Sequence, residues 1–164
     1  MADAPVIIGA RDDKGAHWSP KPEVGWTLLR ILGLMFVVAG GIDLALLWYP
    51  SRMGTPEFEF ATITQFVAGL PVVTMGLVAL AISAAGSGSR GWLMAVGVLA
   101  IVAVAVLAVL AVIYATTVPL ALRTVSMEVK VGIKKSVVKM VVQCLGYGLG
   151  YLALGWTSLK ASRK

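Results

Sequence analysis

Long apolar stretches alternate with short polar segments along this chain of 164 residues. Between Arg90 and Arg123, 32 residues pass without one charged side chain, and three further apolar stretches carry few charges. A hydrocarbon core of about 30 Å holds no water for backbone amides, so helices of about 20 apolar residues or closed barrels cross it. The pattern predicts an all-α polytopic integral membrane protein with a bundle of four transmembrane helices.

The predicted domain organisation is one transmembrane domain with a tail at each end. The polar N-terminal tail covers residues 1–22, the four-helix domain covers 23–160, and a basic C-terminal tail covers 161–164. Within the domain, the predicted spans lie at about 26–49, 60–85, 92–118 and 139–159. A short turn of Gly and Ser separates the second and third spans, so these two should be antiparallel neighbours.

Two prolines modify this picture. Pro71 removes one backbone donor inside the second span, which predicts a kink. Pro119 disfavours helix at the residue before it, so we expect the third span to end there.

The linker over residues 120–138 has an ambiguous pattern. Between Thr124 and Lys134, apolar and polar residues alternate as in a strand with one apolar face. The valines at 125 and 129 also stand four residues apart, in line with Ile133, as on one face of a helix. We favour a short amphipathic helix on the membrane surface, with an extended segment that pairs with another chain as the alternative.

Composition and charge agree with a membrane location. The chain is 59% hydrophobic, and its 14 Lys and Arg against 8 Asp and Glu give a net charge of +6. In a membrane protein, an excess of basic residues reflects topology and contact with lipid headgroups. No basic stretch is interleaved with stacking aromatic residues, which argues against nucleic acid as a partner.

An even number of spans places both termini on one side of the membrane. The tails, the start of the first span and the Gly-Ser turn carry eight basic residues, and the opposite loops carry six. The positive-inside rule therefore favours cytoplasmic termini, and we expect a bacterial inner membrane.

Asp43 is the sharpest candidate for function because a carboxylate inside a span normally faces a partner, a cavity or a pathway. Counting an equal depth into the other spans gives one polar layer of Asp43, Gln65, Tyr114 and Gln143. This layer is either a proton, ion or ligand site, or a polar clamp that fixes helix packing through interhelical hydrogen bonds. We favour the clamp, since no second titratable partner is evident.

Small residues predict close helix packing. Gly146 and Gly150 form a GxxxG motif in the fourth span. Packing against Gly33, Gly40 and Gly41 of the first span is as consistent with the sequence as pairing with another subunit.

Aromatic residues mark the membrane boundaries. The expected interfacial anchors are Trp18, Trp26, Trp48, Tyr49, Trp92 and Trp156. Tyr147 and Tyr151 stand four residues apart on the fourth span and could bracket a lipid or pigment tail.

Several kinds of chemistry are disfavoured by counting. His17 is the only histidine and Cys144 the only cysteine. Zinc, haem and iron–sulfur sites need several such ligands, and hydrolase triads need a histidine base beside the nucleophile. We therefore expect no cofactor, no metal and no enzymatic activity.

These observations favour a non-catalytic accessory or scaffold subunit of a larger membrane complex, with lipid and other membrane subunits as partners. Two alternatives stay open. One is a small homo-oligomeric transporter or channel with Asp43 in the pathway, and the other is a protein that binds a lipid or pigment tail.

Overall fold

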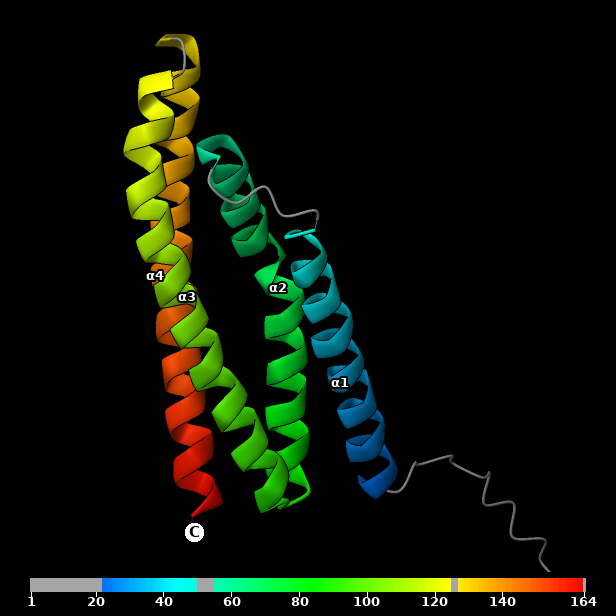
Figure 1. The fold of residues 1–164 in the computed structure, drawn as a ribbon. Helices are drawn as coiled ribbons and strands as arrows, with labels where there is room; N and C mark the ends of the chain where they lie inside the picture. The colour runs from blue at the N-terminus through cyan, green and yellow to red at the C-terminus, as the bar shows by residue number, and fades with distance from the viewer. Residues whose placement is uncertain (1–21, 50–54, 125–126, 164) are drawn as a thin grey trace, which may run out of the picture.

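A computed structural model of the chain describes residues 22–49, 55–124 and 127–163. This part of the chain forms four helices and no strand. They are α1 (Pro22–Leu46), α2 (Pro56–Gly86), α3 (Arg90–Thr124) and α4 (Met127–Ser162), shown in Figure 1. Each is long and apolar enough to cross a membrane, so the predicted four-helix transmembrane bundle is confirmed.

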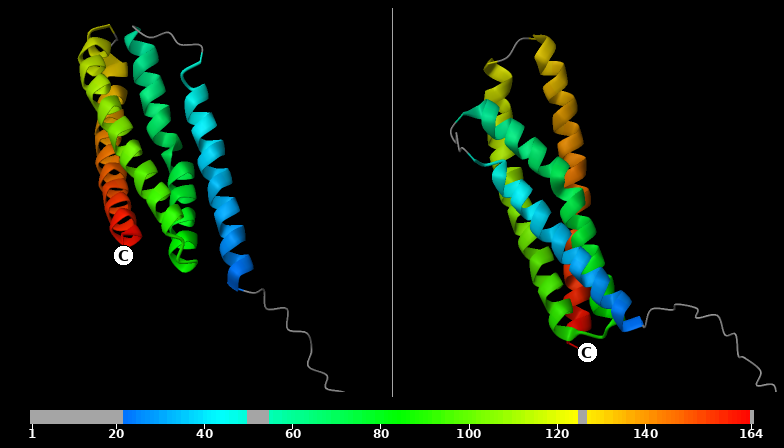
Figure 2. Two further views of the ribbon diagram at one scale, coloured as in Figure 1. Left: turned by 60° about the horizontal axis from the view of Figure 1, so that its bottom comes forward. Right: turned by 90° about the vertical axis from the view of Figure 1, so that its right-hand side faces the viewer.

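Consecutive helices run antiparallel, and the start of α1 and the C-terminus lie at the same end of the bundle (Figures 1 and 2). Each helix packs along the next one in the sequence, and α4 also touches α2. Within the described residues, α1 has backbone contacts with α2 but with neither α3 nor α4. The first helix is therefore a peripheral member of the bundle.

The side chains of α1 agree with this position. Leu44 is the large apolar residue of α1 that is buried, whereas Leu28, Met35 and Leu46 are each at least 60% exposed. The core lies instead between α2, α3 and α4, where Ile63, with no exposed area, belongs to the central cluster. The described residues thus leave one long face of α1 uncovered.

Local sequence explains where α2 begins and how the chain turns into α3. Pro56 occupies the first turn of α2, where its missing N–H removes no hydrogen bond of the helix. The negative charge of Glu57 interacts favourably with the positive end of the helix dipole. Gly88 has a φ of 63°, a conformation that glycine adopts without strain, and it lets α3 start at Arg90.

Neither internal proline ends its helix. Figures 1 and 2 show a bend partway along α2, the helix that contains Pro71, as expected for a missing backbone donor. The prediction that α3 ends at Pro119 is wrong, since the helix continues to Thr124. Ala121, 3% exposed, is buried beyond the proline, so tertiary packing holds the last turns of α3 in place.

The linker is helical but is not a separate surface element. Residues 127–138 form the first turns of α4, so neither the isolated amphipathic helix nor the extended segment is present there, and residues 125–126 lie outside the described part. Ile133 and Met140 are buried. Ile133, the member of the apolar stripe that the structure describes, therefore packs within the bundle.

Tryptophans at the end that holds the C-terminus allow the membrane boundaries to be estimated. Trp26 packs beside Gly86, and Trp92 lies against the Arg30 side chain. Tryptophan gathers at membrane interfaces, and a core of about 30 Å takes about 20 helical residues. Counting about 20 residues along each helix puts the opposite boundary near Leu46, Phe66, Val112 and Met140.

The other end of the bundle therefore projects beyond this boundary. Figure 1 shows α3 and α4 reaching past the end of α1. At 1.5 Å per residue, the turns of α4 before Met140 extend roughly 20 Å. Thr117 donates a hydrogen bond of 2.8 Å to Glu59, which ties α3 to α2 in this projecting part.

Candidate functional site

Asp43 lies on the uncovered face of α1. Its side chain is exposed and makes no hydrogen bond or ion pair with the part of the chain that the structure describes. Its neighbours Ile42 and Leu46 are 54% and 60% exposed, and Ala39, one turn away, is also exposed. The carboxylate therefore stands on an apolar surface, three residues or roughly 5 Å from the estimated boundary at Leu46.

The structure does not bring the four members of the expected polar layer together. Tyr114 is buried, Gln143 is half-buried, and Gln65 is exposed like Asp43. No hydrogen bond joins them among the described residues. Counting residues along each span put the four side chains at equal depth. The helices are rotated, however, so that Asp43 and Gln65 point away from the bundle centre.

Tyr114 is the buried member of that set. It is 4% exposed, and its ring stacks on Phe60 with centroids 5.4 Å apart. Its hydroxyl has no hydrogen-bond partner of standard geometry. The Thr64 hydroxyl interacts with it, but Thr64 donates its own proton to the Phe60 carbonyl at 2.7 Å. The contact with Thr64 then uses the Tyr114 proton, and the lone pairs of the phenol oxygen remain unused.

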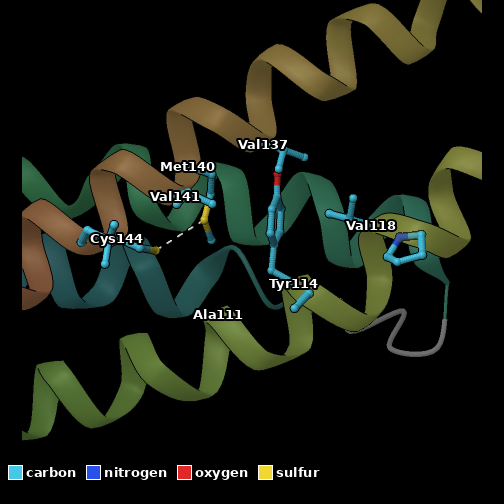
Figure 3. Close-up of a pocket in the computed structure, with 10 residues that line it drawn as sticks. Ala111, Tyr114, Val118, Val137, Met140, Val141 and Cys144 are labelled. Atoms are coloured by element: carbon cyan, nitrogen blue, oxygen red, sulfur yellow. Dashed lines mark hydrogen bonds between the residues drawn. The ribbon is translucent and has the colours of Figure 1, made fainter.

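A groove between α3 and α4 borders Tyr114 (Figure 3). Its volume is about 340 Å³. Apart from Tyr114 and Cys144, its lining side chains are apolar, and the Cys144 thiol lies 3.4 Å from the Met140 sulfur. This groove suits an apolar ligand.

A different set of polar contacts, here called the Arg30 clamp, joins three helices at the end of the bundle near the C-terminus. The sequence analysis did not predict it. The Arg30 guanidinium donates to the Ser87 hydroxyl at 2.7 Å and lies 5.2 Å from the centroid of the Trp92 ring. Beside it, the Ser83 hydroxyl donates to the Trp26 carbonyl at 2.7 Å. The available signal was a lone arginine in an apolar span facing a Ser-rich turn.

The clamp leads to a stability prediction. We expect Arg30→Gln to lower the free energy of unfolding by about 2 kcal/mol, because it removes a charged hydrogen bond and a cation–π contact. Arg163→Gln, an exposed basic residue at the same end, should change it by less than about 0.5 kcal/mol. Thermal unfolding of the purified protein in detergent measures both, and equal effects would show that the clamp contributes nothing.

The glycines divide into packed and open positions. Gly33 and Gly40 face α2 so closely that a Cβ would meet its atoms at 2.9 and 2.8 Å. Among the described residues, nothing lies within 4 Å of such a Cβ at Gly41, Gly146 or Gly150. The GxxxG motif of α4 therefore does not mediate packing within the described part of the chain. The glycines that do pack against another helix include Gly76 and Gly97, which the sequence analysis did not single out, and Gly155.

The open GxxxG face forms one wall of a second groove, of about 450 Å³, between α2 and α4. Tyr147 and Tyr151 also line it, with ring centroids 6.2 Å apart. Tyr151 is 2% exposed, and its hydroxyl lies 2.7 Å from that of Thr74 on α2. Tyr151, one of the two tyrosines expected to bracket a lipid or pigment tail, thus joins α4 to α2.

The expected interfacial anchors occupy different environments. Trp26 and Trp92 take part in the clamp, and Trp48 is half-buried near the end of α1. Tyr49 and Trp156 are 81% and 71% exposed, and Trp18 lies outside the described residues.

Comparisons with known proteins add no functional information. No family model, curated protein or solved structure matches this chain.

Proposed function

We propose that this protein is a non-catalytic accessory or scaffold subunit that associates with other membrane subunits through the outer face of α1. The observation that carries this proposal is the exposed carboxylate of Asp43, which has no partner among the described residues. A carboxylate at the centre of a lipid-facing span costs about 2.5–3.5 kcal/mol, and less toward the interface. A partner helix with a hydrogen-bond donor or a cation at this depth would remove that cost.

The groove of α4 supports a second contact with a partner helix. Gly146 and Gly150 are exposed and open to close approach, and Ala153 and Thr157 continue the small-residue lining of the same groove. Small residues at this spacing let helix backbones approach closely in membranes. A subunit with two such faces could bridge neighbours in a complex.

Site-specific cross-linking in native membranes tests this proposal. A photoreactive residue at Ala39, one turn from Asp43, should yield adducts with another polypeptide, and so should one at Gly146. The same residue at Val112, an apolar position of α3 that is 65% exposed, is the control and should yield lipid adducts alone. Lipid adducts alone at all three positions would contradict the proposal.

The same adducts distinguish the alternative function. A transporter or channel with Asp43 in its pathway would place the carboxylate between copies of the chain, because Asp43 faces away from its own bundle. Adducts between two copies at Ala39, with none to unlike chains, would favour that alternative over the accessory subunit.

The proposed location is the bacterial inner membrane with both ends of the chain in the cytoplasm. The support is the basic bias toward the side of the tails.

A further inference from the structure

The groove bordered by Tyr114 lies at the depth where lipid tails meet headgroups. The estimated boundary crosses α3 near Val112 and α4 near Met140, and the groove is lined on α3 from Ala111 to Pro119. Its rim residues Val141 and Leu145 are 48% and 62% exposed at the surface of the bundle. A lipid beside the bundle can therefore reach it.

The groove has the size of a site for a small apolar ligand. The groove offers about 340 Å³, which lies at the lower end of the range for small-ligand sites.

Two lysines stand on the projecting side of the groove. Lys130 and Lys134 precede Val137, Val141 and Cys144 at steps of four, three, four and three residues, so all five share one face of α4. Lys134 is exposed and Lys130 half-buried. Their flexible stems can lie along apolar surface while the ammonium groups reach headgroup level. The mouth of an apolar groove thus carries two positive charges.

Tyr114 forms part of the wall of the groove. Tyr114 is buried, and its hydroxyl has no hydrogen-bond partner of standard geometry. Figure 3 shows its ring crossing from α3 toward Val137 on α4. The ring therefore adds aromatic surface to the apolar lining of the groove.

We propose that the groove binds one acidic glycerophospholipid, with an acyl chain against the apolar lining and the phosphate between Lys130 and Lys134. An uncharged lipid would leave the two lysines unused, and a soluble anion would leave the apolar lining empty. The proposal does not depend on the partner contact at Asp43.

Native mass measurement of the full chain in detergent, titrated with phosphatidylglycerol or phosphatidylcholine of the same acyl composition, tests this site. The wild type should bind phosphatidylglycerol at least about 10-fold more tightly than phosphatidylcholine. The double variant Lys130→Gln, Lys134→Gln should lose about 30-fold in phosphatidylglycerol affinity, as expected for two lysine contacts.

The chain offers a matched control. Lys135 and Lys139 are exposed on the opposite face of α4 at similar depth, and Lys135→Gln, Lys139→Gln should change the affinity less than about 3-fold. Equal losses in the two pairs would reduce the effect to general surface attraction and overturn the proposal. Equal affinity of the wild type for the two lipids would overturn it as well.

Filling the groove tests the acyl site separately. Ala115→Phe should abolish retention of phosphatidylglycerol, whereas Ala105→Phe, at an exposed position outside the lining, should not. Undiminished binding in a folded Ala115→Phe variant would contradict the placement of the chain. If that variant does not fold, the comparison of the two lysine double variants still tests the proposal.

Discussion

Replacing Gly76 with alanine is expected to separate α1 from α2 and to destabilise the bundle by about 3 kcal/mol. A Cβ at Gly76 would lie 2.7 Å from the Gly33 carbonyl oxygen and 2.8 Å from the Val37 amide nitrogen. Backbone atoms cannot move aside by changing rotamer, so the two helices must shift. Unfolding in increasing concentrations of denaturing detergent measures the loss.

The matched control is Gly41→Ala on the open side of α1. No described residue lies within 4 Å of a Cβ at this position, and alanine is favoured over glycine in a helix by about 1 kcal/mol. This variant should be as stable as the wild type or slightly more so. Equal destabilisation by Gly76→Ala and Gly41→Ala would contradict the close approach of α1 and α2.

Replacing Asp43 with alanine is expected to weaken the partner contact about 5- to 30-fold, the equivalent of 1–2 kcal/mol for one interhelical hydrogen bond in a membrane. The folded chain itself should lose no stability, because Asp43 has no partner among the described residues. The measurement is the yield of cross-links from Ala39 in native membranes, together with the unfolding curve of the purified chain.

Asp43→Asn separates the possible roles of this carboxylate. Asparagine keeps hydrogen bonding and loses the charge, so cross-linking should persist if a hydrogen bond holds the partner. Loss of cross-linking in Asp43→Asn would instead indicate an ion pair. An unchanged yield in Asp43→Ala would show that Asp43 makes no contact with a partner.

The sequence was sufficient to predict the four helices, because long stretches without charge have few other solutions in a membrane. It was not sufficient to predict which way each helix turns its polar residues. Depth follows from counting residues, and it placed Asp43 and Tyr114 in one layer. Rotation follows from packing, which leaves Asp43 exposed and Tyr114 buried.

Other differences have the same physical origin. The clamp at Arg30 forms because the turn after α2 brings Ser87 back to α1, a juxtaposition of residues 57 positions apart. The linker pattern fitted both a strand and a helix, and burial of Ile133 within the bundle accompanies the helix. Pro119 would end an isolated helix, but α3 continues past it to the buried Ala121.

The central claim is that the uncovered face of α1 is covered by other subunits in the native membrane. Native mass measurement of the tagged full chain, extracted in mild detergent from the membrane in which it is naturally made, tests this claim most directly. We predict a mass well above the 17.2 kDa of the chain. Polypeptides other than this chain should be released when the complex is activated in the mass spectrometer. A single species at 17.2 kDa, with or without bound lipid, would contradict it.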